Sequence, residues 1–476
     1  MKVKNDLFNV FIYLSSGIGF IISLLFYENF ANGYEQMIFF PLIFFILYLL
    51  FLENLRHSSV PFTAYGIIGM EWIRFVLMPP ICATAGDYAG FNYINPSAQS
   101  LHLATTLMIY EIFAVAIFCR IFISIKNSNK DVNSSSQISF LKGNRFVYLS
   151  FILLALVVFL TIGRNSNLLN FLYIPVNSSE RIGDITTTSL VLARQILIIG
   201  IFLVFLWTVS YCKRKYEQTF NKLYIYLSLL VALLNVAIIV GERRTAQVYT
   251  AVICIWILIR SFPGFKKKIV FSIVSTATVI LVLMSIYKFF GAFQYDSYSA
   301  ALSNSNADIS WLSRTLQSYF FGPENVAITL DFFKSIDVGT GNMFYDFLRS
   351  TFGVSFLLKG DGVLTSEIFN TYIYGIERPT GHVISAIGYS VLFFGIFLAP
   401  IFALFNIFIS AKVEKQLYKS KSYEMMYVWG YVLVRFATNL FVNTPPLISN
   451  ASIMLGTAGL LFFTAFTLKL KKRYGI

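Results

Sequence analysis

Residues 223–261 have the sequence LYIYLSLLVALLNVAIIVGERRTAQVYTAVICIWILIRS. The stretch consists of two apolar runs, 223–240 and 246–261, joined by the five residues Gly241–Thr245. An apolar run of about 20 residues is long enough to cross a bilayer as an α-helix. The stretch therefore predicts two adjacent membrane helices with a very tight turn between them, and that turn carries two arginines.

The same pattern extends along the whole chain of 476 residues. The chain is 57% hydrophobic and only 13% charged, whereas soluble domains are about 25% charged. Twelve apolar runs approach the spanning length: 8–27, 37–52, 63–85, 104–125, 146–163, 188–211, 223–240, 246–261, 269–289, 383–411, 425–443 and 450–468. We predict an all-α polytopic membrane protein with about 12 transmembrane helices. Its first run is a membrane helix rather than a cleaved signal peptide.

The runs divide the chain into three segments. Residues 1–289 hold helices 1–9, and residues 383–476 hold helices 10–12 and the C-terminal tail. Between them, residues 290–382 form one large loop, which is far longer than an ordinary connection. Its aromatic, amphipathic stretches at 310–321 and 342–358 predict short helices over the membrane surface that form a lid or a cleft wall.

The basic residues predict the orientation. If the N-terminus is cytoplasmic and the helices alternate, the inside loops and the C-terminal tail collect most of the 37 lysines and arginines, as the positive-inside rule requires. Both termini are then cytoplasmic, and the large loop is extracytoplasmic. Topology thus accounts for most of the net charge of +14, so this charge gives no reason to expect nucleic acid as a partner.

The two sides of the membrane use different cations. Lysine dominates inside, whereas ten of the thirteen cations elsewhere are arginine. Guanidinium binds phosphate in a bidentate way and stays charged, so these arginines suggest recognition of an anion. Arg243 and Arg244, at the mouth of the helical bundle, are interpreted as a pyrophosphate clamp. The alternative is a pair that reaches lipid headgroups, with Glu242 as local partner.

Further charged groups lie in or beside the apolar runs. Arg194 is about two turns into run 188–211, and Arg435 lies near the middle of run 425–443, with Glu71 and Glu111 as candidate partners. Glu71 and Arg74 are three residues apart and are expected to pair with each other. Arg378 and His382 close the large loop, and His382 is a candidate general base or oxyanion ligand. The alternative for each is a structural ion pair or an interfacial side chain without a role.

Cofactor and metal chemistry has no support in the sequence. The four cysteines lie in or beside apolar runs and show no CxxC spacing. We find no phosphate-binding glycine loop, no HExxH helix and no DxD pair. We therefore predict no cofactor and a metal-independent site.

The architecture and two short motifs resemble the O-antigen polymerase and ligase superfamily. The shared features are a dozen helices, a large outer loop before the last three helices, a Gly-x-Arg turn at Gly241–Arg243, and a loop that ends Arg378-x-x-x-His382. The chain is more similar to the oligosaccharide repeat-unit polymerases, since Val383 follows His382 where ligases usually have Asn.

The resemblance implies a GT-C-like membrane glycosyltransferase at the outer face of the bacterial cytoplasmic membrane. Such an enzyme transfers a growing glycan from undecaprenyl pyrophosphate to a lipid-linked repeat unit, with inversion and without metal. Its implied partners are these lipid-linked oligosaccharides, the bilayer and a chain-length regulator protein. The implied catalytic residues are His382 and Arg243, with Arg244, Arg194, Arg435 and Arg378 binding pyrophosphate. A flippase or other transporter, a ligase-type transferase and a non-enzymatic scaffold are the alternatives.

Overall fold

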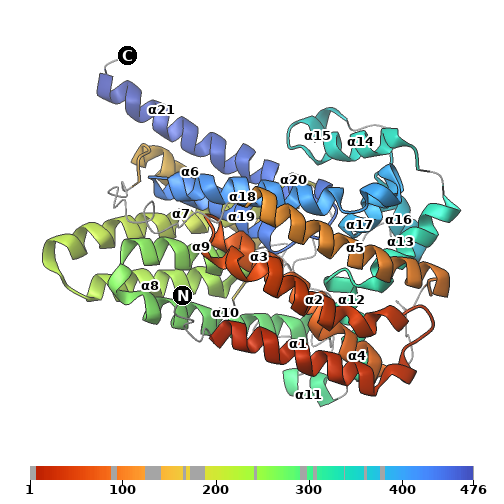
Figure 1. The fold of residues 1–476 in the computed structure, drawn as a ribbon. Helices are drawn as coiled ribbons and strands as arrows, with labels where there is room; N and C mark the ends of the chain where they lie inside the picture. Colours follow the sequence, from red (N-terminus) through yellow and green to blue (C-terminus); the bar gives the residue numbers. More distant parts are fainter. Residues whose placement is uncertain are drawn as a thin grey trace. The chain divides into compact units, whose positions relative to one another are not determined.

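Long apolar helices make up most of the computed structural model (Figure 1). The structure describes residues 7–86, 94–123, 141–164, 168–171, 188–240, 244–289, 297–303, 308–336, 338–358, 362–375 and 381–474. By their contacts, these residues form two units. The first holds 1–134, 306–416 and 435–452, and the second holds 135–305, 417–434 and 453–476.

The described residues confirm a helical protein with many candidate membrane spans. Nine helices are long and apolar enough to cross a bilayer: Leu7–Leu25, Glu35–His57, Pro61–Ala85, Ala98–Phe122, Arg145–Gly163, Ser189–Thr219, Pro263–Ile286, Ile396–Lys419 and Thr444–Lys471. Two of the other predicted runs form shorter apolar helices, Leu223–Ala237 and Ala246–Ser261. The remaining run contains a helix of 15 residues, Tyr423–Ala437. The total of twelve spans stays a prediction, because these three helices are shorter than a typical span.

The first unit contains most of the N-terminal helices and the short helices of the large loop. Its helices are α1 (Leu7–Leu25), α2 (Phe40–Leu47), α3 (Pro61–Trp72), α4 (Met78–Ala85), α5 (Ala98–Phe122), α12 (Ile309–Tyr319), α13 (Pro323–Ser335), α14 (Thr340–Ser350), α15 (Val354–Leu357), α16 (Thr365–Tyr374), α17 (Ala386–Phe394), α18 (Ile401–Lys419, to Gln416) and α20 (Thr444–Met454, to Ser452). The predicted helices at 310–321 and 342–358 thus correspond to α12, α14 and α15. Their position over the membrane surface stays a prediction.

Two predicted membrane runs are interrupted. Run 383–411 divides into α17 and α18, and the helix of run 425–443 ends at Ala437, so that α20 begins at Thr444 rather than near residue 450. The residues before α17 and before α20 pair with each other: Ala386 N donates to Phe441 O (2.7 Å) and Asn443 N donates to Ile384 O (3.1 Å). The predicted runs extend across these interruptions because apolar residues such as Ile384, Phe441 and Val442 keep the hydropathy high there.

A buried asparagine completes the interruption before α20. The Asn406 amide, on α18, donates to the carbonyl oxygens of Leu440 (2.9 Å) and Val442 (2.8 Å) and accepts from the Thr444 hydroxyl (2.9 Å). Asn406 is fully buried. The side chain therefore replaces the helical partners that these carbonyl groups lack.

Within the described residues, the second unit contains eight α-helices and one short β ribbon. Its elements are α6 (Arg145–Val158), β1 (Leu169–Phe171), α7 (Thr188–Thr219), α8 (Leu223–Ala237), β2 (Ile238–Val240), α9 (Arg244–Ser261), α10 (Lys266–Phe289), α11 (Tyr298–Ser303), α19 (Tyr423–Ala437, to Val434) and α21 (Leu460–Tyr474). Strands β1 and β2 are antiparallel, and Asn170 pairs with Ile239. This ribbon is a small addition to the predicted all-helical fold.

Replacement of Asn406 by leucine should destabilise the protein by about 2–4 kcal/mol, since two buried carbonyl groups lose their partners. Thermal unfolding in detergent measures the loss. Asn29 is exposed, so Asn29→Leu is the matched control and should change the midpoint little. Equal midpoints for the two variants would contradict the role assigned to Asn406.

Candidate functional site

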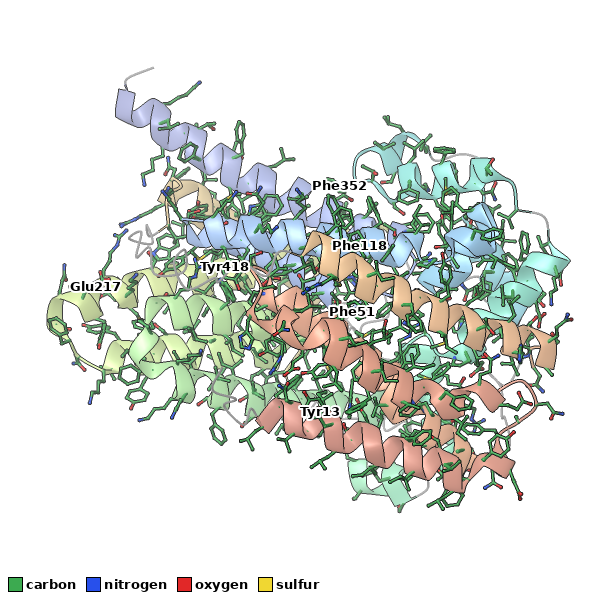
Figure 2. All side chains as sticks on the ribbon, viewed as in Figure 1. Tyr13, Phe51, Phe118, Glu217, Phe352 and Tyr418 are labelled. Carbon is green, nitrogen blue, oxygen red and sulfur yellow. The ribbon has the colours of Figure 1, made fainter. Side chains whose placement is uncertain are left out.

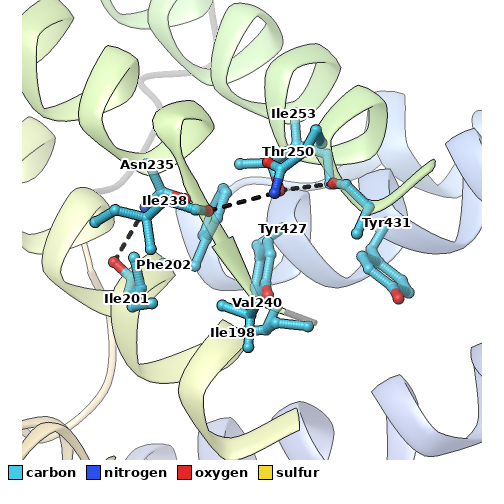
Figure 3. A pocket seen from close by; sticks show the side chains of 12 residues that line it. Ile198, Ile201, Phe202, Asn235, Ile238, Val240, Thr250, Ile253, Tyr427 and Tyr431 are labelled. Carbon is cyan, nitrogen blue, oxygen red and sulfur yellow. Dashed lines mark hydrogen bonds between the residues drawn. The ribbon is translucent and has the colours of Figure 1, made fainter. Parts of the chain in front are cut away.

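A pocket opens in the second unit between α7, α8, β2, α9 and α19 (Figure 3). Its lining residues are Ile198, Ile201, Phe202, Asn235, Ile238, Val240, Ala246, Gln247, Thr250, Ile253, Tyr427 and Tyr431. The free space is about 20 Å³, which is room for a water molecule or one small polar group. A sugar ring does not fit inside, so a large substrate would extend beyond the pocket.

Described residues on both sides of the predicted arginine turn line this pocket. Val240 is the last residue of β2 and pairs with Leu169 of β1. It packs in a buried apolar cluster with Leu168, Ala193 and Leu197. Residues 241–243 lie outside the described residues, and α9 begins at Arg244, two residues before the lining residue Ala246. The predicted turn therefore joins two lining residues of the pocket along the chain.

Two polar atoms of the pocket wall have no hydrogen-bond partner in the described structure. They are the Gln247 side-chain oxygen and the Tyr427 hydroxyl, and these side chains are 3% and 1% exposed. Buried polar groups are nearly always hydrogen-bonded, and each exception calls for an explanation. Water or a polar group of a ligand inside the pocket would satisfy both atoms.

The other polar side chains of the pocket hold the wall together. The Asn235 amide donates to Ile201 O (3.1 Å), the Gln247 amide donates to Ile238 O (3.3 Å), and the Thr250 hydroxyl donates to Ala246 O (2.9 Å) (Figure 3). The rings of Phe202 and Tyr427 stack with their centroids 3.9 Å apart. These contacts fix Tyr427 and Gln247 in place, so their free atoms are preorganised.

The predicted pyrophosphate ligands are distributed over both units. Arg194 lies on α7, one helical turn before the lining residue Ile198, and therefore on the same face of that helix. Arg244 opens α9, whereas Arg243 and Arg378 lie outside the described residues. Arg435 belongs to the first unit. The convergence of these five guanidinium groups on one site stays a prediction.

His382 lies in the first unit and is 5% exposed. Its Nε2 accepts a hydrogen bond from the Asn325 amide (2.8 Å), and its backbone is held by Asn370 through a donor and an acceptor bond (2.7 and 2.9 Å). The pKa of His382 is lowered to about 4 by burial. The imidazole is therefore neutral at pH 7, but it needs to break its bond with Asn325 before Nε2 can take a proton.

Glu71, Arg74 and Glu111 form a completely buried charge cluster in the first unit. Arg74 Nη1 lies 3.3 Å from a Glu71 oxygen and 2.8 Å from a Glu111 oxygen, and its guanidinium lies over the ring of Phe441, 4.2 Å from the centroid. The predicted pairing of Glu71 with Arg74 is confirmed. Glu111 is a candidate partner of Arg435 in the sequence analysis, but in the structure it contacts Arg74. Helical spacing cannot reveal this contact, because Glu111 and Arg74 are on different helices.

The comparisons with known proteins found no relative. No family model matches the chain, and neither a similar curated protein nor a similar solved structure is found. The proposed function therefore rests on the residues of this chain. The sequence analysis missed Gln247 and Tyr427, although Gln247 is a polar residue within an apolar run, two residues after the predicted Gly241–Thr245 turn.

Replacement of Tyr427 by phenylalanine should leave stability unchanged or slightly raised, because its hydroxyl has no partner to lose. Tyr423 is the matched control on the same helix. It is also buried, and its hydroxyl bonds with the Ser261 hydroxyl (2.8 Å). Tyr423→Phe should cost about 1 kcal/mol, and thermal unfolding compares the two. An equal loss for Tyr427→Phe would mean that its hydroxyl is bonded.

Stability should depend on pH through His382. Its pKa is about 4 when folded and about 6.5 when unfolded, so the unfolded chain binds the extra proton between these values. Stability is therefore complete above pH 6.5 and is lost as pH falls toward 4, by about 3 kcal/mol.

The difference in unfolding free energy between wild type and His382→Gln measures this contribution across pH 4–7. The exposed His57 provides the control variant His57→Gln, which should follow the wild-type curve. If the His382→Gln and wild-type curves stay parallel down to pH 4, the assigned environment of His382 is wrong.

Proposed function

We propose that the protein is a polymerase that joins lipid-linked oligosaccharide repeat units into a surface polysaccharide. The observation that carries this proposal is a pocket whose buried Gln247 and Tyr427 atoms lack partners and whose lining residues Val240 and Ala246 flank the predicted Gly241–Thr245 turn in the sequence. Support also comes from the many candidate spans and from the predicted excess of arginine away from the cytoplasmic side. The proposed location of the reaction is the outer face of the bacterial cytoplasmic membrane.

The proposed chemistry needs a cationic site at the membrane boundary. Transfer of the growing glycan breaks the bond between sugar and undecaprenyl pyrophosphate, and the leaving group is multiply charged. Fixed guanidinium groups stabilise this charge as it develops, which is a large contribution in such reactions. In this proposal Arg243 and Arg244 contact the pyrophosphate, and Arg194, Arg378 and Arg435 are further candidate ligands.

The reaction proposed for this site is inverting and independent of metal. A general base takes the proton of the acceptor hydroxyl, and His382 is the candidate for this role once its Nε2 is released from Asn325. The pocket accommodates only a small polar group. Under the proposal, the sugars therefore lie outside it.

A transporter is the second candidate, and one observation favours it. Glu71, Arg74 and Glu111 are fully buried on apolar helices, and charges inside membrane spans commonly mark transport pathways. A flippase for lipid-linked oligosaccharides would use the same substrate class. A ligase-type transferase, which would move finished glycan to a different acceptor, is the third candidate.

Replacement of Arg243 or Arg244 by lysine should abolish long polymer. Lysine keeps the charge but lacks the bidentate geometry, and loss of such a stabilising donor costs about 100-fold or more in rate. Gel analysis of the surface glycan measures chain length. Arg164 is an exposed arginine directly after the short π-helix Phe159–Gly163 that continues α6, and Arg164→Lys is the matched control that should keep normal chains.

The glycan pattern separates the candidate functions. A defective polymerase leaves single repeat units on the final acceptor, seen as a short-chain band, whereas a defective flippase or ligase leaves no surface glycan from this pathway. Protein abundance is measured in the same cells. Normal-length polymer in both Lys variants would overturn the arginine clamp.

A further inference from the structure

Helices α14 and α15 form a short hairpin that is attached to a candidate membrane span. At the turn between them, Phe352 N donates to the Ser452 hydroxyl (3.0 Å), which in turn donates to Ser350 O (3.2 Å). Ser452 belongs to α20, so the turn lies directly against this helix (Figures 1 and 2). All of these residues are in the first unit.

Ser452, to which the hairpin is attached, lies inside the candidate span rather than beyond its end. The span Thr444–Lys471 has 28 residues, which is about 42 Å of helix, whereas the hydrocarbon core is about 30 Å thick. The basic residues Lys469 and Lys471 place one boundary near that end. Counting back about 20 residues from Lys469 reaches Ser449, so Ser452 lies just within the apolar region at the other boundary.

The hairpin turns an apolar face outward. Phe344 and Leu348 are one helical turn apart on α14 and are 64% and 50% exposed, and Leu357 on α15 is 85% exposed. On the opposite face of α14, buried Asp346 accepts hydrogen bonds from the Tyr389 hydroxyl (2.7 Å) and from Thr365 N (3.0 Å). Asp346 therefore fixes the rotation of α14, so the outward position of Phe344 and Leu348 is built into the fold.

Polar contacts hold the hairpin in shape, and its apolar face takes no part in them. Arg349 donates from its guanidinium to Ser355 O, and the Tyr345 hydroxyl donates to Gly362 O (2.9 Å). Gly362 lies against the Tyr345 ring, where a Cβ atom would collide with it. The hairpin therefore keeps its shape through polar contacts, and Phe344, Leu348 and Leu357 are left for another environment.

We propose that the α14–α15 hairpin inserts Phe344, Leu348 and Leu357 into the lipid leaflet at the Thr444 end of the span. The lipid is favoured over a protein partner for two reasons. The hairpin is attached to the span at the level of the hydrocarbon boundary, where lipid is the surrounding medium. Moreover, a stable protein interface uses about 20–30 residues per partner, whereas this face offers three large side chains.

The insertion gives the large loop a fixed anchor on the bilayer. Arg349, close to the turn, is then at the level of the lipid headgroups, where its charge is favourable. α13 and α16 of the same unit carry Asn325 and Asn370, which hold His382. The anchor therefore sets the height of this cluster above the membrane, and it does so independently of which reaction the protein performs.

Site-directed spin labelling of the full-length protein in vesicles of phosphatidylethanolamine and phosphatidylglycerol tests the insertion. Labels are placed in Phe344→Cys, Leu348→Cys and Leu357→Cys, and the four native cysteines are buried. Lys334→Cys is the control, because Lys334 lies in the same loop region with a side chain that is 51% exposed. Collision rates with oxygen and with a water-soluble nickel complex are measured for each label.

The expected result is a severalfold higher ratio of oxygen to nickel collisions at residues 344, 348 and 357 than at residue 334, since oxygen concentrates in lipid. A ratio equal to that of residue 334 means that the hairpin is in water and overturns the proposal. Low rates with both reagents mean contact with protein, either a second copy or a partner, and also overturn it. Thermal unfolding of each variant confirms that the labelled proteins are folded.

Discussion

Every backbone polar group that is removed from water needs a hydrogen-bond partner, and this constraint governs the first unit. Where α17 and α20 begin, the chain is not helical, and the residues before one helix bond with the residues before the other. Asn406 supplies the remaining donor for Leu440 and Val442. The interruptions are therefore stable because the residues of each one supply hydrogen-bond partners to the other. These bonds connect two parts of the chain about 60 residues apart.

Two buried carboxylates supply such partners to backbone N–H groups. Glu414 accepts from Phe62 N, Thr63 N and the Thr63 hydroxyl at the start of α3 (2.7–2.8 Å). Within the second unit, Glu424 accepts from Lys142 N, Gly143 N and the Tyr148 hydroxyl close to the start of α6. Helix N-termini have free N–H groups and a partial positive charge, so an acid from another helix stabilises each of them. Both acids therefore have a structural role.

Several buried polar atoms of the described residues have no hydrogen-bond partner, and two of them lie in the wall of one pocket in the second unit. These are the Gln247 oxygen and the Tyr427 hydroxyl. Such an atom can be completed by water or by a polar group of a ligand. Val240 and Ala246 of the same lining flank the predicted Gly241–Thr245 turn in the sequence, which is why we place the proposed function there.

The sequence by itself determined the class of protein and the local features. Apolar runs predicted membrane helices, and a spacing of three residues paired Glu71 with Arg74. Both of these depend on residues that are neighbours along the chain.

Only the tertiary structure decided which distant groups meet. It paired Glu111 with Arg74, divided two apolar runs at the residues that Asn406 and its neighbours hold, and brought Gln247 and Tyr427 to one pocket. The physical reason is that hydropathy measures only the transfer of each residue into an apolar medium. Hydrogen bonds and ion pairs depend instead on partners from other helices, and the sequence does not state where those helices pack.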